Sequence, residues 1–146
     1  MERIVTDISE LRKLPEVASS GNDVQGLANR LFSAMEEWGG QGLAANQIGI
    51  SRRIFVLLLQ NATPICIVNP TITKQKGSQE SNEGCLSLPG VIVRVKRPHR
   101  VRVKGFNQYW VPVNYKFEGI DARRACHEID HLDGKLIIDY GNGFKA

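Results

Sequence analysis

The pattern His127-Glu128-x-x-His131 constrains this chain more than any other part of its sequence. On a helix, residues four positions apart share one face, and their Cβ atoms lie about 5–6 Å apart. Two imidazoles in that arrangement can bind one metal ion, which leaves Glu128 beside the ion as a base for bound water. The alternative is an amphipathic helix with two surface histidines and a solvated acid. The first interpretation predicts a helix over Ile120–Leu132 and requires the fold to bring another ligand to it.

That further ligand is expected upstream of the helix. A catalytic metal site of this kind uses three protein ligands and leaves one position open for water. No histidine follows His131, and Asp133 and Asp139 are poor candidates. A cysteine thiolate is the natural partner for two imidazoles.

The three cysteines differ in how well they suit this role. Cys126 directly precedes His127, so its side chain points about 100° away around the helix. Cys66 lies in an apolar run, where a small buried hydrophobe is expected. Cys85 follows Gly84 in a predicted loop next to a strand, which is a suitable place to present a ligand. A packed thiol is an equally good interpretation of Cys85 read alone.

The remaining pattern predicts a single α+β domain over residues 1–146, without repeats or a linker. Helices are expected over Asp7–Leu14, with Asp7 as the cap, and over Asp23–Trp38, before Gly39-Gly40. Gly134 is expected just after the third helix. Pro112 places the last long strand at an edge or bulge. The expected strands are Ile54–Leu59, Pro64–Val68, Gly90–Val95, Arg100–Phe106, Trp110–Phe117 and a short one at Lys135–Asp139, with turns near Gln60-Asn61 and Asn107-Gln108.

Composition favours a protein of the cytosol. Three cysteines are a small and odd number, which argues against a disulfide framework, and the N-terminus has no signal-peptide pattern. No apolar run approaches the roughly 18 residues of a membrane span. The formal net charge is +4, and one basic stretch is expected to form the solvated face of one or two strands. That stretch contains Arg94, Lys96, Arg97, Arg100, Arg102 and Lys104.

Three motifs occur in a specific order and spacing. They are Gly40-Gln41-Gly42-Leu43-Ala44-Ala45-Asn46-Gln47, Glu83-Gly84-Cys85-Leu86-Ser87 and His127-Glu128-Ile129-Asp130-His131. In these motifs the chain resembles the peptide deformylase family, and the similarity extends from about Gly21 to Tyr140. The resemblance implies antiparallel-rich mixed sheets packed around a central helix that carries the His-Glu-x-x-His motif.

The resemblance also implies an activity and a cofactor. The family hydrolyses a linear amide: it removes the N-formyl group from the formyl-methionine of nascent polypeptides and releases formate during protein biosynthesis. Cys85, His127 and His131 would bind one divalent ion, with ferrous iron as the native metal and zinc, nickel or cobalt as substitutes. Glu128 would act as general base and acid. Expected donors to the formyl oxygen are the Gln47 side chain and the Leu86 backbone N–H, and expected substrate-binding residues are Gly40, Gln41, Gly42, Glu83 and Gly84.

Two other functions fit some of the same residues. A zinc endopeptidase would share the helix motif, but this chain lacks the third ligand that is expected downstream of that motif. A non-catalytic metal-bound module could bind RNA or the ribosome through the basic strands, although it would need neither Glu128 nor Gln47. By resemblance, the partners are N-formylated nascent peptides and, transiently, the ribosome; no membrane partner is expected. The protein is expected to be a monomer in the cytoplasm of a bacterium or of a phage-infected host.

The chain departs from the usual family pattern at three places. Cys126 stands where glutamine is common, and Arg124 stands where an apolar residue usually lies near the methionine pocket. Arg124 is expected to extend to solvent, pair with Glu83 or reshape the pocket. The sequence ends at Ala146, as in truncated members known from viral genomes, which weakens the expected ribosome contact. Asp130 is either a surface carboxylate or the partner of an arginine such as Arg97.

Overall fold

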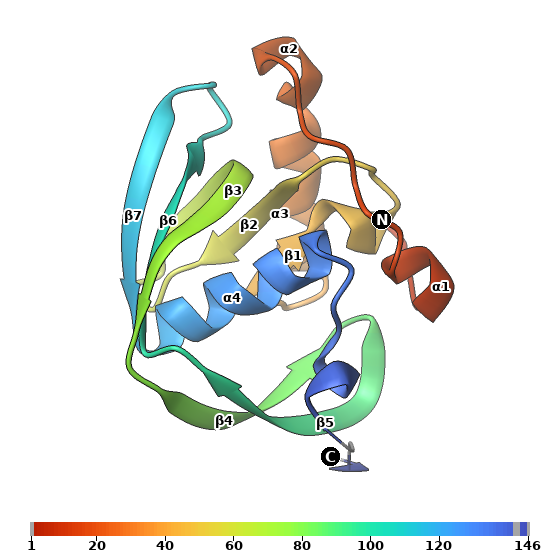
Figure 1. Ribbon diagram of the computed structural model, residues 1–146. Helices are drawn as coiled ribbons and strands as arrows, with labels where there is room; N and C mark the ends of the chain where they lie inside the picture. Colours follow the sequence, from red (N-terminus) through yellow and green to blue (C-terminus); the bar gives the residue numbers. More distant parts are fainter. Residues whose placement is uncertain (1, 142–143, 146) are drawn as a thin grey trace.

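A five-stranded antiparallel sheet forms the larger layer of the computed structural model, which describes residues 2–141 and 144–145 (Figure 1). The strands follow the order β1-β2-β3-β6-β7, so β1 and β7 are the edges. Pro112 begins the edge strand β7, which confirms the placement expected for a residue without a backbone N–H. The strands are β1 Gly42–Ala44, β2 Ile54–Leu58, β3 Pro64–Lys76, β6 Arg100–Phe106 and β7 Pro112–Glu118.

The strand β2 is buried on both faces because its alternate side chains enter two different core clusters. Ile54 and Val56 pack in the cluster that includes the helix α3, Leu27–Glu37. Phe55 and Leu57 point the other way and pack in the cluster that includes the helix α4, Ile120–Leu132. Since successive side chains of a strand face opposite sides, a continuous apolar run is what a strand between two helices requires.

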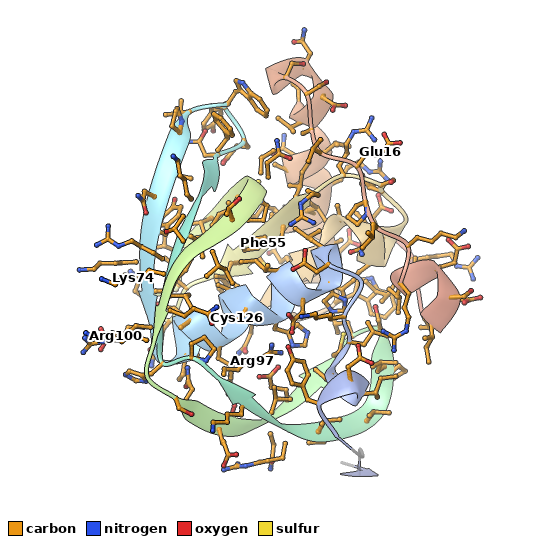
Figure 2. All side chains as sticks on the ribbon, viewed as in Figure 1. Glu16, Phe55, Lys74, Arg97, Arg100 and Cys126 are labelled. Carbon is orange, nitrogen blue, oxygen red and sulfur yellow. The ribbon has the colours of Figure 1, made fainter. Side chains whose placement is uncertain are left out.

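The other end of the same sheet is covered on one face only. Val101 and Val103 of β6 are buried beneath α4, whereas Arg100, Arg102 and Lys104 are exposed. Lys74 of β3 projects from the same outer side as Arg100 (Figure 2). The predicted solvated basic face is therefore confirmed for these strands.

A smaller antiparallel sheet lies on the opposite side of α4 (Figure 1). It has the order β4-β5-β8, and α4 contacts both β5 and the larger sheet. All the pairings between its strands, and between those of the larger sheet, are antiparallel, which confirms the α+β class and its antiparallel character. The strands are β4 Gln79–Cys85, β5 Leu88–Arg97 and β8 Phe144–Lys145.

The helices follow the expected positions with two corrections. Asp7 caps α1, Ile8–Leu11, by accepting hydrogen bonds from two backbone N–H groups, as predicted. The helix expected over Asp23–Trp38 is wrong as one element, because it divides into α2 and α3 at Gly26, whose φ is +82°. A left-handed residue cannot continue a right-handed helix. The strand expected over Lys135–Asp139 is also wrong, since this segment leads into the 3₁₀ helix η2. The remaining bounds are α2 Gly21–Val24, the 3₁₀ helix η1 Ala45–Ile48 and η2 Ile137–Tyr140.

The helix α4 begins and ends at the predicted residues, Ile120 and Leu132, with Gly134 just after it. Within the described part of the chain, no helix is long and apolar enough to cross a membrane.

Candidate metal centre

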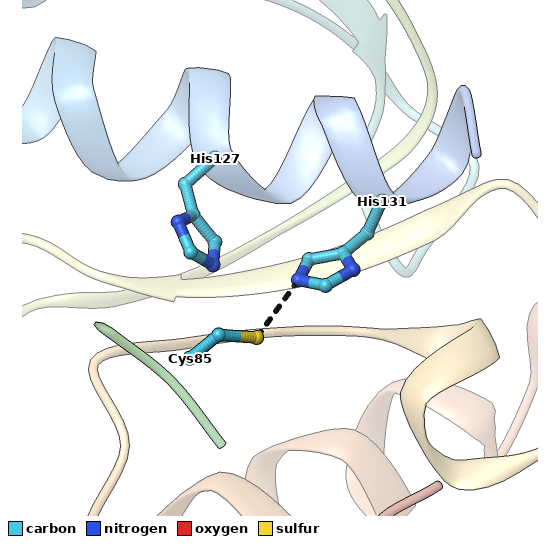
Figure 3. A group of neighbouring side chains, drawn as sticks. All are labelled: Cys85, His127 and His131. Atoms are coloured by element: carbon cyan, nitrogen blue, oxygen red, sulfur yellow. Dashed lines mark hydrogen bonds between the residues drawn. The ribbon is translucent and has the colours of Figure 1, made fainter. Parts of the chain in front are cut away.

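Three candidate ligands converge between α4 and the end of β4 (Figure 3). The donor atoms of Cys85, His127 and His131 lie within 4.8 Å of one another, and the Cys85 Sγ is 3.3 Å from the His131 Nε2. Zinc-type ions take sulfur at about 2.3 Å and imidazole nitrogen at about 2.0–2.1 Å. One ion placed between these three donors therefore fits the donor set with small side-chain adjustments.

The β4–β5 hairpin positions the thiol. Cys85 is the last residue of β4 and pairs with Leu88, after a register shift between Glu83 and Cys85. The expectation of a loop at Cys85 is therefore wrong, although the shift supplies the local irregularity expected there. The other two cysteines are buried in core clusters, where burial raises the pKa of each thiol to about 12. These are Cys66 and Cys126.

A buried network orients His127. Its Nδ1 lies 2.9 Å from a carboxylate oxygen of Glu83, which leaves Nε2 to face an ion. Arg97 donates to both oxygens of Glu83, at 2.8 and 3.0 Å. Burial acts to raise the pKa of Glu83, but the hydrogen bonds from His127 and Arg97 outweigh it and lower this pKa to about 2. Glu83 is thus a fixed anion that holds the ring of His127.

The same network extends to Tyr140 in η2. Arg97 also donates to Asp130 at 2.5 Å, and the Tyr140 hydroxyl donates to Asp130 at 2.5 Å. The predicted pairing of Arg97 with Asp130 is confirmed. The expectation that Arg97 lies on the solvated basic face is wrong, because Arg97, the last residue of β5, is only 4% exposed and its side chain reaches Asp130 of α4 (Figure 2).

The two histidines have opposite pKa shifts. Burial holds the pKa of His131 well below its usual value. Burial acts to lower the pKa of His127 as well, but the charge of Glu128 and contacts with Cys85 and Glu83 outweigh it, and this pKa lies well above its usual value. An imidazole must be neutral to bind a metal, so an ion that enters the site displaces a proton from His127.

Glu128 lies against β1 in a buried position. It is 4% exposed, and its Oε1 has no hydrogen-bond partner among the described residues. Burial is the main cause that raises the pKa of Glu128 to about 7. A Cβ on Gly42 would lie only 2.6 Å from the Glu128 Oε2, so glycine at this position makes room for the carboxylate.

The side-chain amide of Gln47 points toward the thiol. Its Oε1 accepts from the Ala44 backbone N–H at 3.0 Å, and its Nε2 lies 3.1 Å from the Ser87 Oγ and 3.5 Å from the Cys85 Sγ. Since the acceptor side is fixed by the backbone, the NH₂ group is held facing the site. Ser87 belongs to a motif noted in the sequence, but nothing there indicated its contact with Gln47.

Asn46 ties the neighbouring 3₁₀ helix η1 to α4. Its side-chain NH₂ donates to the His131 carbonyl at 2.7 Å, which fixes the last turn of the helix relative to β1. Asn46 was quoted in the first motif without a role, because sequence alone does not show which backbone group an amide will reach.

A cavity of about 590 Å³ opens beside Cys85 and His127. Two arginines, Arg123 and Arg124, lie on its wall. The expected pairing of Arg124 with Glu83 is wrong, since Glu83 is occupied by Arg97 and His127; Arg124 instead donates to the Leu58 carbonyl at 2.9 Å. The wall also includes each predicted catalytic and substrate-binding residue, namely Gly40, Gln41, Gly42, Gln47, Glu83, Gly84, Leu86 and Glu128.

Comparisons with known proteins agree on one family. The sequence model of the family described as Polypeptide deformylase matches residues 5–146. A peptide deformylase from Lachnoclostridium phytofermentans is 43% identical over 119 residues, which cover 80% of this chain and 73% of that protein.

Two solved structures show the same fold. A peptide deformylase from Legionella pneumophila superimposes with a TM-score of 0.91 at 36% identity and covers 97% of this chain and 86% of its own. The deformylase of the Vibrio parahaemolyticus bacteriophage VP16T, solved in complex with actinonin, gives a TM-score of 0.87 at 39% identity, over 92% of this chain and 99% of its own.

Proposed function

This chain belongs to the polypeptide deformylase family, and on that premise we propose a role for each residue of its site. The protein is a metal-dependent hydrolase that removes the N-formyl group from nascent polypeptides. Neither the endopeptidase nor the non-catalytic module finds support in the matches. The observation that carries the proposed roles is the meeting of Cys85, His127 and His131 beside the buried Glu128.

Cys85, His127 and His131 hold one divalent ion per chain. A bound ion supplies a Lewis acid and lowers the pKa of coordinated water. One thiolate and two imidazoles suit several first-row metals, and we assign ferrous iron as the native one, with zinc, nickel or cobalt as substitutes. Glu83 serves this site by fixing the tautomer and orientation of His127, since both its oxygens are already hydrogen-bonded.

Glu128 transfers the proton. A general base works best when its pKa is near the operating pH, and burial brings the pKa of Glu128 to about 7. It accepts a proton from the attacking water and delivers it to the departing amine, which leaves formate and a peptide with a free N-terminus. The free Oε1 of Glu128 is the atom available for this proton.

Gln47 and the backbone N–H of Leu86 stabilise the negative charge that develops on the formyl oxygen. The NH₂ group of Gln47 already faces the Cys85 sulfur, at 3.5 Å. Loss of one such donor typically lowers the rate by about 10²–10³-fold.

The substrate lies as an added strand along β1. This strand is an edge of the larger sheet, and the cavity wall beside it includes Gly40, Gln41 and Gly42. Gln41 continues the ladder by accepting from the Leu58 N–H at 2.9 Å. An edge strand next to a cavity is suited to bind an extended peptide. Gly84 borders the same cavity from β4.

We assign a transient ribosome contact to a basic face, defined as Lys74, Lys76, Arg100, Arg102 and Lys116. These five cations line a second cavity, of about 270 Å³, on β3, β6 and β7. Lys74, Arg102 and Lys116 are direct cross-strand neighbours, and like charges in such positions repel one another. An anionic partner such as a phosphate backbone would relieve that repulsion. The protein acts as a monomeric single catalytic domain in the cytoplasm.

The test is formate release from formyl-Met-Ala-Ser by anaerobically purified protein, with bound metal counted in the same sample. We expect turnover with about one metal per chain, and Glu128→Ala should keep the metal while turnover falls by about 10²–10⁴-fold. Full activity in that variant, or no formate from the metal-loaded protein, would contradict the proposed roles.

A further inference from the structure

Two neighbouring arginines on the cavity wall have no acidic partner. Arg123 and Arg124 lie on α4, one turn before His127, and both border the cavity that Cys85 and His127 line. Among the described residues, neither guanidinium is within ion-pair distance of a carboxylate. Arg124 donates through Nη1 to the Leu58 carbonyl, but its buried Nε has no partner. This end of the cavity therefore carries two positive charges and unused donors.

The acids on the same wall do not offset these charges. Glu83 is held by Arg97 and His127, and Glu128 lies against Gly42 rather than within ion-pair distance of either arginine. Guanidinium groups that are half-buried and unpaired bind carboxylates through charge-assisted, often bidentate, hydrogen bonds. This wall of the cavity is therefore suited to bind an anion.

The arginines lie along the path proposed for the substrate. Gly42 is the β1 residue next to Glu128, and it pairs with Leu57. Arg124 contacts the next residue of β2, Leu58, whose N–H donates to Gln41. Arg124 is therefore displaced from the catalytic carboxylate by one strand position, about 3.3 Å, toward Gly40. A peptide that leaves the reaction site along β1 passes this arginine.

We propose that Arg123 and Arg124 select formyl peptides that carry aspartate or glutamate at the third residue. Alternate side chains of an extended peptide face the same way, so a peptide whose first side chain lies against the arginine-bearing wall directs its third side chain to the same wall. The aliphatic stems of the arginines can line the methionine while their charged ends reach the carboxylate. This inference rests on the proposed function and names a substrate class for the same site.

The experiment compares kcat/KM for formate release from peptides that differ in one side chain. Formyl-Met-Ala-Glu should exceed formyl-Met-Ala-Gln by about five- to tenfold, the size of one charge-assisted hydrogen bond at a half-buried site. Formyl-Met-Ala-Lys should be slower than both. Formyl-Met-Glu-Ala should gain little, because the second side chain faces away, and added salt should reduce the preference.

Variants connect the preference to the arginines. Arg123→Met and Arg124→Met should each reduce the Glu-to-Gln ratio toward one, whereas Arg124→Lys, which keeps the charge, should retain part of it. Arg3→Met is the matched control: Arg3 is exposed and outside the cavity wall, so the ratio should not change.

The failure of this inference and the failure of the proposed function give different results. Equal rates for the Glu and Gln peptides, a preference confined to the second residue, or an unchanged ratio in both methionine variants overturn the inference while deformylation stands. No formate from any of the peptides overturns the proposed function itself.

Discussion

A single missing methyl group allows β1 and the buried carboxylate of Glu128 to be neighbours. A Cβ on Gly42 would lie 2.6 Å from the Glu128 Oε2 and 3.0 Å from the Glu128 carboxyl carbon. Backbone and carboxylate can therefore both border the proposed substrate path. The glycine is needed for space, since its φ is not among the positive values of this chain.

Gly42→Ala should impair catalysis more than folding. The added methyl group forces Glu128 out of its position, and a displacement of about 1 Å in a catalytic group can lower kcat by about 10²-fold. The measurement is kcat for formate release together with the melting temperature. Gly21→Ala is the control. Its added Cβ would lie 3.3 Å from the Trp110 side chain, and neither residue belongs to the cavity wall, so this variant should keep wild-type kcat. Wild-type kcat in Gly42→Ala would show that Glu128 is not held by this contact.

The carboxylate of Glu128 should make the metal-free protein less stable at high pH. Its pKa in the folded state is about 7, above the ordinary value of 4.5, so the folded state binds the proton more tightly than the unfolded state. The contribution of Glu128 to the free energy of unfolding is fully present below pH 4.5. As pH rises through 7, up to about 3 kcal/mol of this contribution is lost.

Denaturant unfolding of metal-free protein at pH 5 and pH 8 tests whether stability falls as pH rises. Glu128→Gln removes the titration, so it should gain stability relative to the wild type as pH rises between these values. Parallel pH profiles for the two proteins would argue against a raised pKa at Glu128.

At the scale of elements, the sequence pattern predicts α4 to the residue but not the break at Gly26. The helix α4 has a periodic apolar face and a glycine just after it, and both signals are local. The apolar periodicity continues across Gly26, so the pattern indicates one helix, whereas the backbone adopts a left-handed conformation there. The strand β4 was not predicted because its run Gln79–Cys85 is polar and gains its stability by pairing with β5.

The candidate site was predictable where a motif carried it and unpredictable where distant side chains meet. Cys85, His127 and His131 follow from motif order, and the structure brings them together. The burial of Arg97 had a local signal that the basic composition obscured. Val93, Val95 and Arg97 alternate along β5, so period two places all three on the inner face.

Arg97 joins β5 to α4 through two carboxylates, so its removal should affect both stability and metal binding. Arg97→Met leaves Glu83 and Asp130 buried or half-buried without their cation, and we expect a loss of about 3–5 kcal/mol in unfolding free energy. Metal affinity should fall by about 10–100-fold, because Glu83 no longer holds His127 firmly.

Arg100→Met is the matched control for Arg97→Met. Arg100 pairs with Glu118 on the surface, both side chains being 61% exposed, so its loss should cost less than about 1 kcal/mol. Unfolding in urea and metal titration report the two effects. Equal losses in the two variants would mean that the buried network is not what stabilises the hairpin.

At the scale of the molecule, the two faces of the larger sheet have different tasks. One packs on α4, and the other packs on α3 at β2 and presents the basic face to solvent on β3, β6 and β7. The triple variant Lys74→Gln, Arg102→Gln, Lys116→Gln should weaken co-sedimentation with ribosomes by at least about tenfold at low salt. The same variant should be slightly more stable than the wild type, because it removes a row of like charges.

The control for this prediction carries the same change in charge elsewhere. Arg3, Lys96 and Lys135 are exposed and outside the basic face, so their combined change to glutamine should leave ribosome binding near the wild-type level. Equal binding by the two triple variants would indicate that net charge, rather than the basic face, attracts the partner.

The unequal burial of the three thiols allows alkylation to measure how much of the protein carries a metal. Cys66 and Cys126 are 1% and 5% exposed, whereas Cys85 borders the cavity. A soluble alkylating reagent should therefore modify the native protein once, at Cys85, and an ion already bound there should block it. Counting labels per molecule by mass spectrometry would then report what fraction of any preparation is loaded, without a kinetic assay.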